Sequence, residues 1–111
     1  MEDIHQQNTQ QQRREAIYLA LAQIPKGNVI SYGELAKLAG LTNGARLVGK
    51  TLSNLPKGST LPWYRVINSQ GKISLPPDSP SYEKQIKNLT KEGIEVVNGK
   101  ISLKRFGYKL W

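Results

Sequence analysis

The sequence predicts a single, mainly α-helical domain with small β elements, organised around a helix-turn-helix. The chain has 111 residues, which is enough for one domain with a modest core. Apolar residues recur at three- and four-residue spacing in several segments, a pattern typical of amphipathic helices. Two of these segments, residues 32–39 and 45–55, are separated by a short glycine-containing turn, as a helix-turn-helix requires.

The N-terminal segment differs in composition from the rest. Residues 1–12 are polar and rich in glutamine, so we expect a flexible tail, or the loose start of the first helix, followed by one domain over residues 13–111. The first helix is expected to begin at Arg13 and to end at the breakers Pro25 and Gly27. No apolar run resembles a secretory signal or approaches the ~18–20 residues of a membrane span. We therefore expect a cytoplasmic protein.

The first helix of the helix-turn-helix has a clear start signal. Ser31 and Glu34 form a capping box, in which the Ser31 hydroxyl accepts a hydrogen bond from the Glu34 amide and the Glu34 carboxylate can reach back to the Ser31 amide. The helix is predicted to run over residues 32–39 and to stop at Gly40.

The second helix of the pair is predicted over residues 45–55. Val48, Leu52 and Leu55 recur at the spacing of a buried face. Arg46, Lys50 and Asn54 occupy another face, again four residues apart. This basic outer face is the first indication of an anionic partner.

The remainder of the chain predicts smaller elements. Residues 61–68 favour a short buried strand entered through Pro62, and residues 66–74 favour a loose hairpin. A further helix is expected from Pro80 to Gly93, capped by Ser79.

The C-terminal segment contains a strong turn signal. Asn98-Gly99 fits a type I′ turn, so residues 95–103 are predicted to form a hairpin, which behind a helix-turn-helix would be a wing. The basic, aromatic tail over residues 105–111 either packs back on the domain or contacts phosphates.

The charge distribution favours a polyanionic partner. The formal net charge is +8, from 16 Lys and Arg against 8 Asp and Glu. No acidic residue lies between Glu34 and Asp78, whereas this stretch contains Lys37, Arg46, Lys50, Lys57, Arg65 and Lys72. Such a region suits nucleic acid or an anionic membrane surface, and a merely solvated face is the alternative.

The residue types that are missing exclude several kinds of chemistry. The sequence contains no cysteine and a single histidine, His5, in the polar tail. Disulfides, thiolate metal sites, thiol nucleophiles and histidine-based triads are therefore excluded. We expect no catalytic residue, no metal and no cofactor.

Three ordered motifs resemble those of a known family. They are Ile24-Pro25-Lys26-Gly27 with Ser31-Tyr32-Gly33-Glu34-Leu35-Ala36, then Ala45-Arg46-Leu47-Val48-Gly49, then Pro62-Trp63-Tyr64-Arg65-Val66-Ile67. Together they resemble the DNA-binding domain of the O6-alkylguanine-DNA alkyltransferases. In these enzymes the third motif is Pro-Cys-His-Arg-Val, and its cysteine accepts the alkyl group. Trp63 stands at the cysteine position, as it does in the alkyltransferase-like proteins.

The resemblance implies a DNA damage recognition protein that is not an enzyme. Such a protein binds O6-alkylguanine in duplex DNA from the minor groove, flips the base out and directs it to nucleotide excision repair proteins. Independently, alkyl transfer needs a soft nucleophile of low pKa, which Trp63 cannot supply. A monomer is expected. The alternative is a winged-helix regulator that reads sequence in the major groove without lesion preference.

The resemblance also assigns residues to DNA binding. They are Tyr32, Gly44, Ala45, Arg46, Gly49 and Lys50. Arg46 matches the arginine finger that fills the gap left by the extruded base, and a guanidinium plane is suited to stacking on bases. Tyr32 matches the tyrosine that pushes on the phosphate beside the lesion. Asn54 matches the asparagine that ties this helix to the pocket strand.

A second set of residues is assigned to the lesion pocket. They are Tyr32, Trp63, Tyr64, Val66 and Pro76, the last from a loop over residues 74–78 that carries an arginine in a family member. Tyr64 stands where the enzymes have an activating histidine. Glu92 stands where they have the acid of the same relay, and with that relay interrupted we expect Glu92 to be structural.

Overall fold

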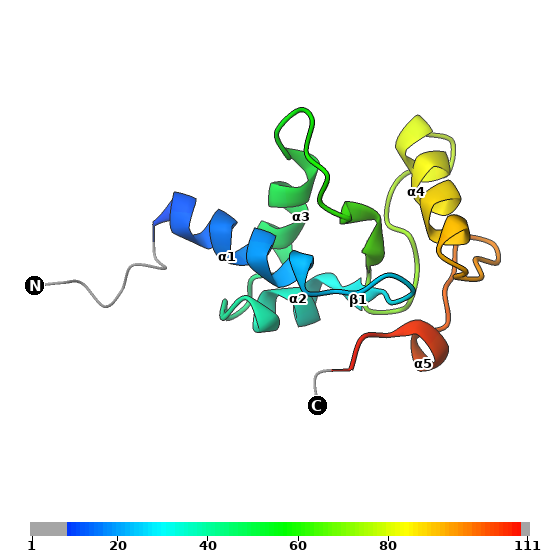
Figure 1. Cartoon of the computed structure of the whole chain (residues 1–111), viewed down its shortest axis with the longest axis horizontal. Coiled ribbons are helices and arrows are strands. Elements are labelled where there is room, and N and C mark those ends of the chain that lie inside the picture. Colours follow the sequence, from blue (N-terminus) through cyan, green and yellow to red (C-terminus); the bar gives the residue numbers. More distant parts are fainter. Residues whose placement is uncertain (1–8, 110–111) are drawn as a thin grey trace, which may run out of the picture.

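The structure, a computed structural model, describes residues 9–109 and consists mainly of helices (Figure 1). The α-helices are α1 (Gln10–Ala22), α2 (Tyr32–Leu38), α3 (Ala45–Ser53), α4 (Pro80–Lys91) and α5 (Leu103–Phe106). A 3-10 helix, η2 (Trp63–Arg65), and two short strands, β1 (Ile30–Ser31) and β2 (Val66–Ile67), complete the described elements. The predicted fold class is confirmed.

The two short strands divide the hydrophobic core into two clusters. They pair in parallel, with Ile30 opposite Val66 and Ser31 opposite Ile67. Ile30 and Val66 point into a core formed with α1, α2 and α3, whereas Ile67 points into a second core with residues of α4 and the C-terminal segment. Successive side chains of a strand face opposite sides, so this small sheet serves both cores. In Figure 1, α1 to α3 lie on one side of β1, and α4 and α5 lie on the other.

The start of α2 follows the prediction in part. Ser31 Oγ accepts a hydrogen bond of 3.1 Å from the Glu34 amide, and Gly40 follows the helix with a φ of +79°. The exposed carboxylate of Glu34 lies 3.6 Å from Lys37 Nζ, so it pairs with a neighbouring lysine and not with the Ser31 amide. One half of the predicted capping box is therefore formed.

The turn between α2 and α3 is tightly packed. Gly44 is buried, and a Cβ added there would lie 3.0 Å from Leu41 Cβ and 3.1 Å from Ala36 Cβ. Real Cβ contacts are rarely this short, so the glycine allows the two helices to approach. The lack of a side chain at Gly44 serves helix packing, and the assignment of Gly44 to DNA binding stays a prediction.

The first helix begins earlier than predicted. Thr9 Oγ1 accepts a hydrogen bond of 3.1 Å from the Gln12 amide and caps α1, which starts at Gln10 and not at Arg13. The tail predicted over residues 1–12 therefore overlaps the helix, and its residues 1–8 lie outside the described part of the chain.

The stretch over residues 61–68, predicted as a strand, contains the 3-10 helix η2 (Trp63–Arg65) followed by the two-residue strand β2 (Val66–Ile67). Val66 and Ile67 are extended and pair with β1. The loose hairpin predicted over residues 66–74 is reduced to a turn, which a hydrogen bond of 2.9 Å from the Asn68 amide to the Lys72 carbonyl closes. Asn68 Oδ1 accepts hydrogen bonds of 2.9 Å from the amides of Gln70 and Lys72, which bends the chain away from β2.

The C-terminal segment folds back on the domain. Asn98 and Gly99 have φ of 52° and 75°, as the predicted type I′ turn requires, and one antiparallel bridge joins Val97 to Lys100. The Val29 amide donates to the Phe106 carbonyl at 2.8 Å, so this part of the tail packs against the domain. No helix in residues 9–109 is long and apolar enough to cross a membrane.

The tight turn at Gly44 gives a stability prediction. We expect Gly44→Val to lower the free energy of unfolding by about 1–3 kcal/mol, because the new side chain must displace Leu41 or Ala36. Gly33→Ala is the control, since an added Cβ there meets nothing within 4 Å and alanine favours the helix. Urea denaturation measures both, and a Gly44→Val variant as stable as Gly33→Ala would contradict the packing argument.

Candidate nucleic-acid interface and adjoining cavity

The outer face of α3 borders an open depression of about 570 Å³. It is lined by Tyr32, Ala45, Arg46, Gly49, Lys50, Ser53 and Ser74. Five of the six residues assigned to DNA binding lie here, and Gly44 is the exception. Arg46 and Lys50 are exposed one helical turn apart, so both cations are free to face an external anion.

A cavity of about 400 Å³ adjoins the depression. Its wall comes from α2, α3, the loop after α3, η2, β2, the loop before α4, and α4. It is lined by Tyr32, Gly49, Leu52, Ser53, Leu55, Pro56, Gly58, Ser59, Trp63, Val66, Leu75, Ser81 and Gln85. The volume falls within the range of about 300–1,000 Å³ that is usual for small-molecule sites. Tyr32, Gly49 and Ser53 line both hollows, so the cavity and the depression lie side by side.

The cavity contains three of the five residues assigned to the lesion pocket. Trp63, Val66 and Tyr32 line it, whereas Tyr64 and Pro76 do not. Trp63 and Tyr64 meet edge to face with ring centroids 6.0 Å apart, because consecutive residues of η2 point in different directions. From the proline-containing loop, Leu75 lines the cavity instead of Pro76.

Tyr32 lies at the junction between the two hollows. Its hydroxyl shares a hydrogen bond of 2.7 Å with the hydroxyl of Ser74, which joins the start of α2 to the loop before α4. A Cβ added at Gly49 would lie 4.0 Å from the Tyr32 ring. With glycine at this position, no side chain of α3 protrudes beside the ring.

Asn54 lies at the end of α3. It is exposed, and its amide donates to the Lys50 carbonyl at 2.9 Å. The predicted tie from Asn54 to the pocket strand is therefore not formed; the side chain closes the last turn of its own helix.

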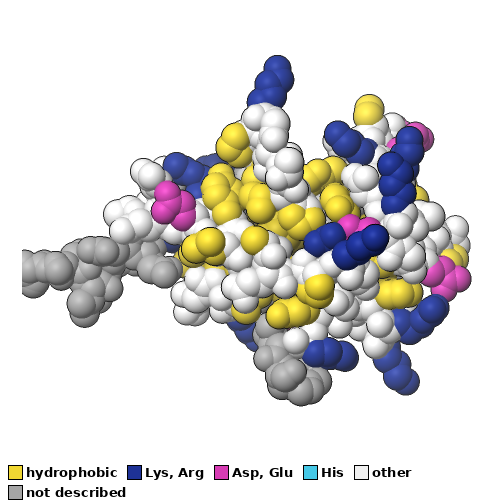
Figure 2. Space-filling view, in the orientation of Figure 1, with side chains coloured by type: hydrophobic (Ala, Val, Ile, Leu, Met, Phe, Trp, Pro, Cys, Tyr) yellow, Lys and Arg dark blue, Asp and Glu magenta, His cyan; other side chains and the backbone are white. Residues whose placement is uncertain are grey.

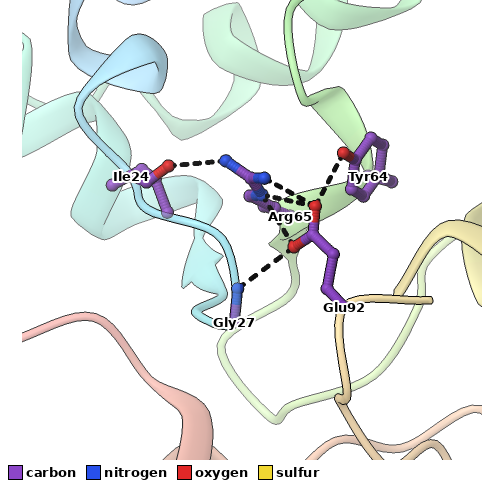
Figure 3. A network of polar contacts seen from close by, with 5 residues as sticks. All are labelled: Ile24, Gly27, Tyr64, Arg65 and Glu92. Carbon is purple, nitrogen blue, oxygen red and sulfur yellow. Dashed lines mark hydrogen bonds and ion pairs between the residues drawn. The ribbon is translucent and has the colours of Figure 1, made fainter. Parts of the chain in front are cut away.

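A polar network lies behind the cavity wall (Figure 3). Glu92 accepts hydrogen bonds from Tyr64 Oη at 2.8 Å, from the Gly27 amide at 3.2 Å and from the guanidinium of Arg65, whose closest atom is 2.5 Å away. Arg65 also donates to the Ile24 carbonyl at 2.7 Å. The Arg65 and Glu92 side chains are only 13% and 8% exposed, so this is a largely buried ion pair.

The network shifts the pKa values of its members. Burial raises the pKa of the Tyr64 hydroxyl, and the hydrogen bond to the Glu92 carboxylate raises it further. The hydrogen bond to Glu92 raises the pKa of the Arg65 guanidinium against the effect of burial. Burial alone would raise the pKa of the Glu92 carboxyl, but the hydrogen bonds from Arg65, Tyr64 and Gly27 together lower it. At neutral pH the pair is ionised and Tyr64 keeps its proton.

This pairing changes which charges can face a polyanion. Arg65 belongs to the acid-free stretch of the sequence, yet its charge is neutralised by Glu92 inside the domain. Arg46, Lys50, Lys57 and Lys72 are exposed. On the face seen in Figure 2, basic side chains lie both near the centre and at the edge, and acidic ones are fewer.

Comparison with known proteins identifies the family. The sequence matches the family described as 6-O-methylguanine DNA methyltransferase, DNA binding domain, over residues 12–94. The chain belongs to this family. It is 53% identical to the DNA base-flipping protein of Vibrio parahaemolyticus over 94 residues, which cover 84% of this chain and 92% of that protein.

A yeast relative connects the fold to damaged DNA. The chain is 40% identical to Alkyltransferase-like protein 1 of Schizosaccharomyces pombe over 80 residues, which cover 72% of this chain and 74% of the relative. The crystal structure of S. pombe Atl1 in complex with damaged DNA containing O6-carboxymethylguanine superimposes with a TM-score of 0.80 and 35% sequence identity. That match covers 86% of this chain and 94% of the yeast chain.

The chain lacks the nucleophile of the alkyltransferase enzymes in its family. No cysteine occurs in its sequence, and Trp63 occupies the wall of the cavity. An indole cannot accept an alkyl group from an ether oxygen as a thiolate can. The chain is therefore not an alkyl-accepting enzyme. No group of three metal-ligating side chains is found among residues 9–109.

Sequence reasoning missed the part of the cavity wall that α4 provides. Ser81 and Gln85 line the cavity, and Gln85 is 3% exposed. A signal was present, since Gln85 falls among Tyr82, Ile86 and Leu89 on the apolar side of the predicted helix. A glutamine in that position is either hydrogen-bonded in the core or directed at a site.

The ion pair behind the wall predicts a pH dependence of stability. The pKa of Glu92 is lower in the folded chain than in the unfolded one, so the unfolded state binds more protons as the pH falls. The stabilisation is complete above the unfolded carboxyl pKa of about 4.3. We expect the free energy of unfolding to fall as the pH drops below about 5, and to fall less in Glu92→Gln.

At pH 7 we expect Glu92→Gln to lower the free energy of unfolding by about 3 kcal/mol, because the buried charge of Arg65 loses its partner. Glu95→Gln is the control, since its carboxylate is 64% exposed and pairs with the exposed Arg105. That change should cost less than about 1 kcal/mol. Guanidinium denaturation across the pH range measures both, and parallel profiles for wild type and Glu92→Gln would refute this role.

Proposed function

We propose that this protein binds O6-alkylguanine in double-stranded DNA, rotates the damaged nucleotide into the cavity and holds it there without chemistry. The observation that carries the proposal is that the cavity lies beside the depression over α3 and shares Tyr32, Gly49 and Ser53 with it. Arg46 and Lys50 line the depression, and Trp63 lines the cavity. A flipped base needs both an external grip on the DNA backbone and an internal wall on which to stack.

In this proposal α3 docks in the minor groove. Ala45 and Gly49 leave its outer surface low, so the helix can approach the DNA backbone. The Arg46 side chain enters the duplex and fills the space of the extruded base, where its planar guanidinium stacks and donates hydrogen bonds. The net charge of +8 supports the attraction to phosphates.

Lesion preference follows from the free energy that flipping the base costs and the free energy that its contacts in the cavity contribute. Flipping costs a few kcal/mol, and less for a base whose pairing is already disturbed, as in O6-alkylguanine. In the cavity the flipped base then stacks against Trp63 and makes apolar contacts with the lining leucines Leu52, Leu55 and Leu75. An O6-alkyl group gains from this apolar contact, whereas a normal guanine keeps its full base pair when it stays in the duplex.

We further propose that the complex passes the lesion to nucleotide excision repair proteins. A protein without a nucleophile cannot restore the base, so the bound lesion must be removed by another activity. The kinship with alkyltransferase-like proteins supports this assignment. The monomeric state and the cytoplasmic location expected from the sequence belong to the same proposal.

A sequence-specific winged-helix regulator explains the structure less well. Such a regulator needs a recognition helix and a wing but has no use for a cavity beside the helix. In the described residues the turn at Asn98 and Gly99 is followed by a single bridge from Val97 to Lys100, which makes a short wing. The cavity therefore favours the damage sensor.

Binding to matched DNA duplexes tests the proposed function. We expect the protein to bind a duplex with one O6-methylguanine at least about tenfold more tightly than the same duplex with guanine, a difference of ~1.4 kcal/mol. Fluorescence anisotropy in two unrelated flanking sequences measures the ratio. Equal affinity for both bases, or a preference that follows the flanking sequence, would support the regulator instead.

The role of Arg46 gives a second prediction. We expect Arg46→Ala to weaken binding to the O6-methylguanine duplex by more than about 1 kcal/mol, a typical cost for a key contact. Lys37→Ala is the matched control, because it removes the same charge from a residue that is exposed, pairs with Glu34 and lies outside both hollows. Equal losses in the two variants would show that Arg46 contributes only its charge.

A further inference from the structure

One buried side chain in the cavity wall has an unused hydrogen-bonding group. Gln85, on α4, is 3% exposed and lines the cavity. Its Nε2 donates to the Tyr64 carbonyl at 2.9 Å and to the Val66 carbonyl at 3.1 Å. Two carbonyl oxygens at one end of the amide require the NH₂ group there, so the orientation of the amide is determined.

The other end of this amide is an acceptor without a partner. Gln85 Oε1 makes no hydrogen bond to any of residues 9–109. Within the same residues, no side-chain nitrogen or oxygen sealed from solvent lacks a partner. Oε1 must therefore reach solvent, and the cavity is the open space that Gln85 lines. The wall thus presents a fixed acceptor to whatever enters.

The cavity provides few other ways to orient a ligand. None of the side chains that line it carries a charge, so neutral hydrogen bonds and stacking must position a base inside it. An acceptor left unpaired beside a buried ligand is costly, because the ligand removes the water that had satisfied it. A ligand with a matching N–H donor avoids this cost.

The chemistry of the lesion supplies one such donor. Guanine carries N–H donors at N1 and at the 2-amino group, and alkylation at O6 removes the proton from N1. The 2-amino group is then the remaining N–H donor on the edges of the base. We propose that Gln85 Oε1 accepts a hydrogen bond from the 2-amino group of the flipped base, which makes Gln85 a specificity residue for 2-aminopurines. The inference rests on the proposed function.

The test combines a change in the base with a change in the protein. Two duplexes differ only in the presence of O6-methylguanine or O6-methylhypoxanthine, which lacks the 2-amino group. Each is titrated with wild type and with Gln85→Leu, and the ratio of the two dissociation constants is compared between the proteins. Loss of the 2-amino group also alters pairing in the DNA, but this effect is the same for both proteins and cancels.

We expect the preference for the base with the 2-amino group to be about tenfold larger in wild type than in Gln85→Leu. Gln85→Lys gives a second variant that keeps a donor for the Tyr64 and Val66 carbonyls but has no acceptor, and it should lose the preference in the same way. Asn88→Leu is the matched control, an amide on the same helix that does not line the cavity, and it should keep the wild-type ratio. Circular dichroism identifies any variant that has not folded.

The outcomes separate this inference from the proposed function. If wild type prefers O6-methylguanine over guanine but Gln85→Lys and Gln85→Leu keep the wild-type ratio, Gln85 does not read the base and the damage sensor stands. If Asn88→Leu loses the preference as well, the effect is not specific to Gln85 and the inference is overturned. If wild type shows no preference for O6-methylguanine over guanine, the proposed function itself fails.

Discussion

The ion pair between Arg65 and Glu92 holds the parts of the site in their relative positions. Through Glu92 it joins the end of α4 to η2, and through Ile24 and Gly27 it joins both to the loop after α1. These segments come from distant parts of the sequence. Their neighbouring residues belong to the two hydrophobic clusters, Ile24 and Val66 to the first and Ile67 and Leu89 to the second. Trp63, two residues before Arg65, and Gln85, two turns before Glu92, are thereby held in the same cavity wall. Breaking a buried ion pair of this kind is strongly destabilising, so arrangements of these segments that separate Arg65 from Glu92 are disfavoured.

The same ion pair keeps the charge of Arg65 away from both the exposed basic surface and the cavity. Arg65 is withdrawn from the exposed cations by its pairing with Glu92, and the cavity itself is lined by uncharged residues. Charge is left on the outside, at Arg46 and Lys50, where it can meet phosphates. The cavity, where a base would lie in the proposed function, offers only stacking and neutral hydrogen bonds from its side chains. Attraction to DNA and selection of a base are thus assigned to different residues.

Much of the site could be read from the sequence because its signals are local. Ser31 and Gly40 mark the ends of α2, and the spacing of Arg46 and Lys50 places both on one helix face. The placement of Tyr64, Pro76 and Gly44 depended on long-range packing, and none of the three lines the hollow to which it was assigned. Tyr64 follows Trp63 in a 3-10 helix, so its hydroxyl turns toward Glu92, and Gly44 is enclosed by Leu41 and Ala36. A motif shows which residues are adjacent in the chain but not which of two neighbours faces a cavity.

The sequence by itself determined the helical class, the absence of a thiol nucleophile and the basic face of α3, because composition and helical periodicity suffice for each. Only the tertiary structure decided that Trp63 and Gln85 share a cavity wall. That pairing needs η2, β2 and α4 to meet through the hydrogen bonds from Gln85 to the Tyr64 and Val66 carbonyls, which join residues 21 and 19 positions apart. Whether a buried amide has a free acceptor depends on such contacts, which no local pattern encodes.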